Sequence, residues 1–117
     1  MQSKGITMPT MLSVYVNDNK ILEYDKNTRH PGKQRQYLEG MDLDMDKGIE
    51  LSGESIATPD KIQRAKYVAM GLLFGFHSGN ESIVSATCAY LANRVPELKQ
   101  IRATEQGEEI MLDLIFN

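Results

Sequence analysis

Residues 58–96 read TPDKIQRAKYVAMGLLFGFHSGNESIVSATCAYLANRVP, and this stretch decides the fold. Thr58, Pro59 and Asp60 are typical of a helix start, because threonine caps the first turn, proline presets its backbone angle and aspartate suits the positive end of the helix dipole. Apolar residues then recur at spacings of three and four, at Ile62, Ala65, Ala69, Leu72 and Phe76. The pattern predicts a helix from residue 58 to about residue 76 with one buried stripe.

The second half of this predicted helix is apolar on every side, since further apolar residues lie off the stripe at Tyr67, Met70, Leu73 and Phe74. A helix of this kind is covered on more than one face. Gly71, Gly75 and Gly79 are spaced four apart, and each glycine inside a helix costs about 1 kcal/mol relative to alanine. Close approach of another helix of the chain, or of a partner chain, would offset that cost. We therefore predict an association surface formed by Tyr67, Met70, Gly71, Phe74 and Gly75.

A second apolar helix is predicted over residues 82–93, which carry no charge. It ends at Arg94-Val95-Pro96, because the residue before a proline disfavours helical backbone. In the corner between the helices, Ser78 and Glu81 fit a capping box in which each side chain satisfies the other's backbone amide. That prediction leaves His77 without a structural role.

Three hairpins are predicted around these helices. Residues 12–24 alternate apolar and polar side chains on both sides of an Asn/Asp turn, and residues 98–105 and 109–116 flank Gln106-Gly107. The last strand is apolar enough to predict a central position in the sheet. Residues 41–51 also alternate, with the carboxylates of Asp42, Asp44 and Asp46 on one side, and predict a further hairpin; a helix over residues 34–45 is the alternative.

The predicted order of elements is therefore ββ-ββ-αα-ββ. An antiparallel sheet built from three hairpins, with two apolar helices packed on one face, is the economical α+β arrangement because each apolar sheet face needs a covering layer. We expect one domain over residues 11–117, preceded by a disordered tail over residues 1–10.

Composition narrows the function classes. The 117 residues are 41% hydrophobic and 25% charged with a net charge of −3, which is ordinary for one folded domain and offers no overall attraction to nucleic acid or an anionic membrane. The longest apolar run, residues 68–76, is shorter than the roughly 20 residues of a membrane span. The single cysteine, Cys88, excludes an internal disulfide and suits the cytoplasm.

A basic loop follows the first hairpin and contains Lys26, Arg29, His30, Lys33 and Arg35. Such a loop is a candidate for binding phosphates or an RNA backbone. The start of the second helix is a separate candidate, because helix amino-termini bind anions, and His77, Ser78 and Asn80 lie there. Glu81 counts against the anion, since it places negative charge at the same position.

Metal and catalytic motifs are weak in this sequence. Asp42, Asp44 and Asp46 resemble the start of a calcium loop, but Lys47 stands where the loop requires glycine and Gly53 where it requires glutamate. Cys88 lies in the middle of a predicted helix, where cysteine acts as a small hydrophobe. We find no phosphate loop, nucleophile elbow or paired-histidine spacing and predict no metal or cofactor.

The sequence thus favours a small noncatalytic protein that acts through self-association as a homodimer or through a protein partner. The first alternative is binding of a small anion, a nucleotide or an RNA backbone at residues 26–35 or 77–82. The second is an enzyme that uses His77 as its acid or base.

Overall fold

The structure is a computed structural model that describes residues 10–28 and 34–116. Within these residues the elements, in chain order, are β1 (Met11–Val16), β2 (Asn19–Asp25), α1 (Gln34–Asp46), β3 (Ile49–Leu51), β4 (Glu54–Ile56), α2 (Lys61–His77), α3 (Glu81–Arg94), β5 (Leu98–Gln106) and β6 (Glu109–Phe116). The predicted α+β class is confirmed. The expected N-terminal tail falls almost entirely outside the described residues.

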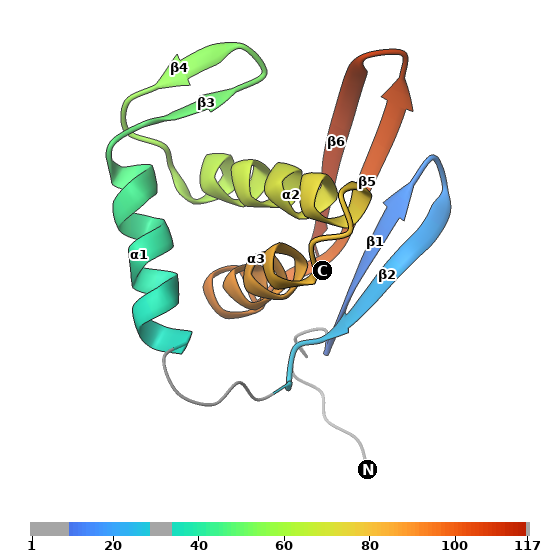
Figure 1. Cartoon of the computed structure of the whole chain (residues 1–117), viewed down its shortest axis with the longest axis horizontal. Helices are drawn as coiled ribbons and strands as arrows, with labels where there is room; N and C mark the ends of the chain where they lie inside the picture. Colours follow the sequence, from blue (N-terminus) through green and yellow to red (C-terminus); the bar gives the residue numbers. More distant parts are fainter. Residues whose placement is uncertain (1–9, 29–33, 117) are drawn as a thin grey trace.

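The main sheet has four strands in the order β2-β1-β5-β6 (Figure 1). The outer pairs are the predicted antiparallel hairpins, but β1 and β5 are parallel, with Val14 beside Ile101. The prediction of a wholly antiparallel sheet is therefore wrong at its centre. Alternating patterns identify strands, whereas the direction of two strands far apart in sequence depends on the route of the chain between them.

The first hairpin closes through a two-residue turn. Asn17 and Asp18 have φ angles of 50° and 69°, the left-handed conformation that a tight hairpin turn needs and that asparagine and aspartate tolerate. The backbone N–H of Asn17 also donates to the carbonyl of Ala103, at 2.8 Å. The turn is thereby attached to β5 as well as to its own hairpin.

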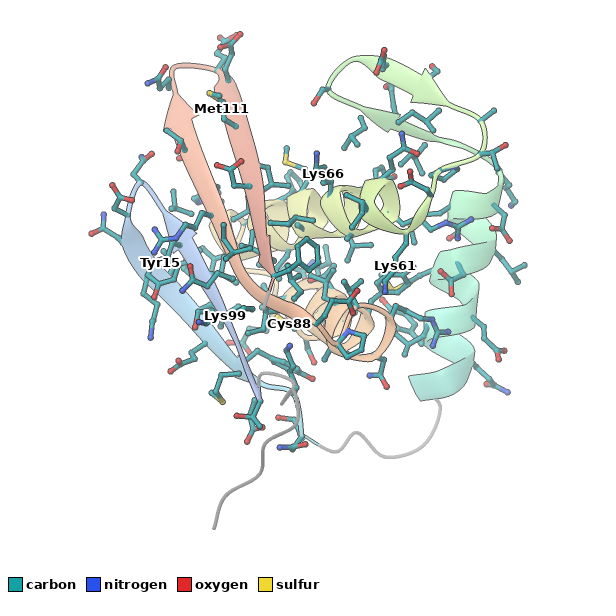
Figure 2. The ribbon with its side chains drawn as sticks, turned by 180° about the vertical axis from the view of Figure 1, so that it is seen from behind. Tyr15, Lys61, Lys66, Cys88, Lys99 and Met111 are labelled. Carbon is teal, nitrogen blue, oxygen red and sulfur yellow. The ribbon has the colours of Figure 1, made fainter. Side chains whose placement is uncertain are left out.

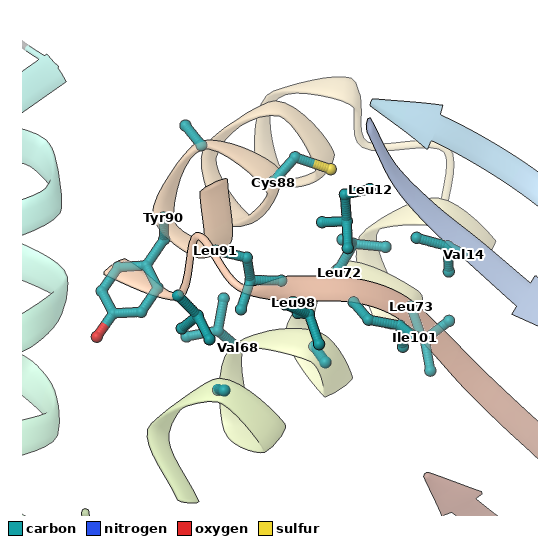
Figure 3. Packing of buried hydrophobic residues seen from close by; sticks show 14 of the residues in the cluster. Leu12, Val14, Val68, Leu72, Leu73, Cys88, Tyr90, Leu91, Leu98 and Ile101 are labelled. Atoms are coloured by element: carbon teal, nitrogen blue, oxygen red, sulfur yellow. The ribbon is translucent and has the colours of Figure 1, made fainter. Parts of the chain in front are cut away.

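Helices α2 and α3 pack on one face of this sheet. Figure 3 shows the shared core, to which the strands contribute Leu12, Val14, Leu98 and Ile101 and the helices contribute Leu72, Leu73 and Leu91. Each of these side chains is at most 1% exposed. Complete burial of one such side chain stabilises the fold by roughly 1.5–3 kcal/mol.

Residues 41–51 do not form the predicted hairpin. Residues 34–46 form α1, the alternative, and a two-stranded hairpin, β3–β4, follows around Ser52 and Gly53. Leu38 and Met45 are buried and Met41 is half-buried, at helical spacings of three and four, while Leu43 is 62% exposed. The helical stripe outweighed the alternating pattern because it buries apolar surface against the rest of the chain.

The helix caps also differ from the prediction. Helix α2 is capped by Asp60 rather than Thr58: the Asp60 carboxylate accepts from the Gln63 amide at 2.8 Å, and the Gln63 side chain accepts from the Asp60 amide. Asp60 is the cap because the glutamine three residues later, Gln63, completes a capping box with it.

At the corner between α2 and α3, the predicted Ser78–Glu81 box is wrong. The α3 cap is Asn80, whose side chain accepts from the Ile83 amide at 3.1 Å. Ser78 instead ends α2, and its hydroxyl donates to the carbonyl of Phe74 at 2.9 Å. Gly79 lies between these two caps and has a φ of 72°, a conformation that glycine reaches without steric strain.

Strand β6 lies at the edge of the sheet, not in the centre as predicted. Leu112, Leu114 and Phe116 face the helical layer but are only half-buried, and Met111 on the opposite face is 65% exposed. The apolar sequence of β6 therefore does not reflect complete burial within the chain.

Among the helices of residues 34–116, none combines the length and hydropathy needed to cross a membrane.

Candidate protein-interaction surface

Two faces of α2 are covered inside the chain. One face contributes Ala65, Ala69 and Leu72 to the core. The other lies against α3, where a Cβ added at Gly75 would stand 2.6 Å from Cγ2 of Ile83. The α2–α3 contact thus explains why Gly75 lacks a side chain, and Gly75 is buried rather than part of a free surface.

The third face of α2 carries two exposed aromatic side chains, Tyr67 and Phe74, with Met70 between them packed partly against the core. Tyr67, Met70 and Phe74 follow one another at spacings of three and four, so they lie on the same side of the helix. Tyr67 is 43% exposed, Phe74 is 68% exposed, and Met70 is half-buried. We call these three residues the α2 ridge. A single exposed apolar residue is ordinary, whereas a contiguous group marks an interaction site.

Acidic hairpins flank α2 on both sides (Figure 2). The β3–β4 hairpin packs on α2 and presents Glu50 and Glu54 to solvent. The β5–β6 hairpin approaches the end of α2, where Glu105 pairs with His77 at 2.9 Å, and its tip carries the exposed Glu108 and Glu109. The two hairpins beside α2 are therefore acidic, whereas the charged residues of α2 itself, Lys61, Arg64 and Lys66, are basic.

Comparison with known proteins identifies no function for this surface. No protein-family model, curated protein or solved structure matches the chain.

The described part of the predicted basic loop has a structural role. The ammonium group of Lys26 donates to the carbonyls of Pro96, at 2.8 Å, and Leu98, so it ties the end of β2 to the start of β5. Burial lowers the pKa of Lys26, although the charge of Glu97 opposes the shift. Arg29, His30, Lys33 and the Arg35 side chain lie outside the described residues.

The predicted corner residues all have partners within the chain. His77 pairs with Glu105, and its ring meets Phe76 edge to face with centroids 5.9 Å apart. Ser78 and Asn80 serve the helix ends. His77, for which the sequence predicted no structural role, therefore has two contacts within the chain.

Cys88 is completely buried in α3. Burial raises the pKa of its thiol to about 12, so the thiolate that nucleophilic chemistry requires is strongly disfavoured at neutral pH. The interpretation of Cys88 as a small hydrophobe agrees with this position.

Asp42 is the centre of a polar cluster that sequence reasoning missed. Its carboxylate accepts from the Tyr90 hydroxyl at 2.5 Å, from Nε of Arg94 at 3.0 Å and from Arg64 at 3.3 Å. Arg64 also bonds Asp46. The cluster joins α1 to both α2 and α3. The sequence would have indicated these contacts only if residues 34–46 had been predicted as a helix, because a helix places Asp42 on the side that faces α2 and α3. Across residues 10–28 and 34–116, no group of three potential metal ligands is assembled.

A second missed contact lies on the sheet face opposite the helices. The Arg102 guanidinium stands 4.2 Å from the ring centroid of Tyr15, and its Nε donates to Gln100 at 2.9 Å. Because Tyr15 and Arg102 are neighbours across β1 and β5, this cation–π contact reinforces the parallel strand pair.

Proposed function

We propose that this protein acts without catalysis, by binding another protein chain through the α2 ridge. The observation that supports the proposal is the exposure of Phe74 and Tyr67 on a helix whose other two faces are packed against the sheet and α3. Aromatic side chains are frequent anchors of protein interfaces because they bury a large area with little loss of conformational freedom.

The charges around the ridge indicate the chemistry of the partner. The β3–β4 hairpin, which packs on α2, carries Glu50 and Glu54, and the tip of the β5–β6 hairpin carries Glu108 and Glu109. A partner with apolar side chains at its centre and lysine or arginine at its rim would complement both features. If two copies of α2 packed antiparallel, the acidic hairpins of one copy would approach those of the other, so we favour a different protein over self-association at this surface.

Site-specific photo-crosslinking in cells tests the proposal. A photoreactive phenylalanine analogue is placed at Tyr67 or Phe74, with Leu43 on α1 as the control because its exposure of 62% is close to that of Phe74. We expect one protein to be crosslinked from both α2 positions and not from position 43. Absence of such a product would contradict the proposal.

A binding measurement with the purified partner completes the test. We expect Phe74→Glu to weaken binding by about 30-fold, the loss of an anchor worth roughly 2 kcal/mol. Leu43→Glu introduces the same charge on another helix and should change the affinity by less than about threefold. Equal affinities for the wild type and Phe74→Glu would contradict the proposal.

The alternatives drawn from the sequence stay predictions. They are binding of an anion, a nucleotide or an RNA backbone, and acid–base chemistry at His77. We rank association above them because Lys26, Ser78 and Asn80 already have partners within the chain.

A further inference from the structure

The outer edge of β6 is a second surface, separate from the α2 ridge. In the four-stranded sheet, β6 pairs with β5 on one side and ends the strand order on the other. It spans eight residues, of which six are apolar, with the sequence EIMLDLIF. Along such an edge, alternate residues direct both their N–H and C=O groups away from the sheet, and these groups can pair with another strand.

The opposite edge of the sheet, formed by β2, carries protecting features that the sequence of β6 lacks. Strand β2 presents the exposed charges of Lys20, Glu23 and Asp25, and its pairing with β1 is interrupted by a register shift at Val14/Tyr15. Charges and bulges of this kind prevent edge-to-edge pairing. The interior of β6 has neither lysine nor proline, and Asp113 is its one charge.

The inner face of β6 is also incompletely covered. Leu112, Leu114 and Phe116 face the helical layer and remain half-buried, while Ile110 is 38% exposed. Since β6 is the last strand, apolar surface placed beside it would cover these side chains further.

We propose that β6 pairs antiparallel with β6 of a second copy of this chain. A two-fold axis perpendicular to the sheet relates two such strands, so the helices of both copies lie on the same face of one eight-stranded sheet. A sheet of this size is common in proteins. The two inner faces then meet along β6, apolar against apolar.

The register of this pairing follows from the side chains. Directly opposed residues point to the same face, so the two-fold axis passes midway between one residue of β6 and the same residue of the second copy. An axis at Leu112 places Met111 opposite Asp113 of the second copy and Ile115 opposite Glu109 of the second copy. An axis at Leu114 places Asp113 opposite Ile115 of the second copy. An axis at Asp113 would oppose two carboxylates, which is destabilising.

A pair of substitutions at one exposed position tests the proposal. Ile115 faces an acidic residue in both allowed registers. We therefore expect Ile115→Glu to weaken the dimer at least tenfold, whereas Ile115→Lys retains it. Both variants place one charge at the same outward position of the monomer, which controls for effects on folding. The association constant is measured by analytical ultracentrifugation of the full chain.

The outcome separates this surface from the α2 ridge. We expect the wild type to be dimeric and Phe74→Glu to leave the dimer unchanged. A wild type that stays monomeric at roughly 100 μM, where a dimer with a micromolar dissociation constant would be populated, overturns the proposal. A dimer that Phe74→Glu dissociates and Ile115→Glu does not would overturn it as well.

Engineered cysteines report the register directly. A disulfide requires Cα atoms within roughly 7 Å, which only the residue at the two-fold axis and its own copy satisfy. We expect Leu112→Cys or Leu114→Cys to crosslink under oxidation, and Met111→Cys, which faces a different residue, to remain uncrosslinked. Crosslinking of Met111→Cys as efficient as at positions 112 and 114 would contradict the ordered pairing.

Discussion

The Cβ position of Gly75 lies 2.6 Å from Cγ2 and 2.9 Å from Cβ of Ile83. No Cβ atom fits at such a distance without movement of a neighbour, so the absence of a side chain at Gly75 permits α2 and α3 to approach this closely. Gly71 differs, because a Cβ there would stand 3.8 Å from Cγ2 of Thr87, an ordinary contact. The two glycines look equivalent in the sequence and have different consequences in the fold.

Gly75→Ala should therefore destabilise the protein. Overpacking costs about 1–3 kcal/mol, and the higher helix propensity of alanine offsets about 1 kcal/mol of that. We expect a net loss of up to about 2 kcal/mol in the free energy of unfolding, measured by urea denaturation. Gly71→Ala is the matched control and should be neutral or stabilising by up to about 1 kcal/mol. Equal effects of the two substitutions would contradict this account.

Asp42→Asn should loosen the attachment of α1. The substitution removes the negative charge that accepts hydrogen bonds from Tyr90, Arg94 and Arg64. We expect a loss of about 1–2 kcal/mol, less than for a fully buried cluster because Asp42 is partly exposed to solvent. Asp44→Asn, at an exposed position of the same helix, should change stability by less than about 0.5 kcal/mol. Similar losses for both variants would argue against the cluster.

The same carboxylate should contribute to acid denaturation. Burial opposes the ionisation of Asp42, but the hydrogen bonds from Tyr90 and Arg94 and the charges of Arg94 and Arg64 outweigh burial and lower its pKa. Its stabilisation is present above the unfolded-state pKa of about 3.9 and is lost as the pH falls through the lower folded-state value. Urea titrations across this range should show a shallower acid loss for Asp42→Asn than for the wild type. Parallel curves would contradict the shift.

The thiol of Cys88 should resist alkylation in the folded protein. Burial raises its pKa to about 12, and its side chain is inaccessible. We expect iodoacetamide at pH 8 to label it at least about a thousandfold more slowly than in urea, because labelling requires opening of the core. The raised pKa also predicts that stability declines above about pH 8.5, where the unfolded thiol loses its proton and the folded one does not. Rapid labelling of the native chain would refute both expectations.

The contact between His77 and Glu105 should be energetically small. Both side chains are partly exposed, and ion pairs in water contribute about 0–1 kcal/mol. A double-mutant cycle with His77→Gln and Glu105→Gln measures the coupling directly. A coupling above about 2 kcal/mol would indicate a more protected site than the exposed positions imply.

Local patterns predicted those elements in which one signal dominated. The Asn17-Asp18 turn identified the first hairpin, and the uncharged run over residues 82–93 identified α3. Prediction failed over residues 41–51, where alternation and helical spacing coexist. Leu38, Met41 and Met45 were the signal for α1, and the helix was only the alternative prediction because the aspartates between them resemble the solvent face of a strand.

The residues of the predicted association surface divide into exposed and covered ones. The excess of apolar residues in α2 pointed to Tyr67, Met70 and Phe74, which are exposed to different extents. Gly75 was assigned to the same surface, yet it faces Ile83 inside the chain. A helical pattern gives the angular position of a residue and does not say which neighbour lies at that angle.

By itself, the sequence determined the α+β class, the two apolar helices and the outer hairpins, because turn chemistry and hydrophobic period act over a few residues. Only the tertiary structure decided that β1 and β5 run parallel, that Asp42 joins three helices and that the apolar strand β6 lies at an edge. Each of these depends on residues more than 20 positions apart in the chain, whose contacts arise from the packing of whole elements rather than from any local pattern.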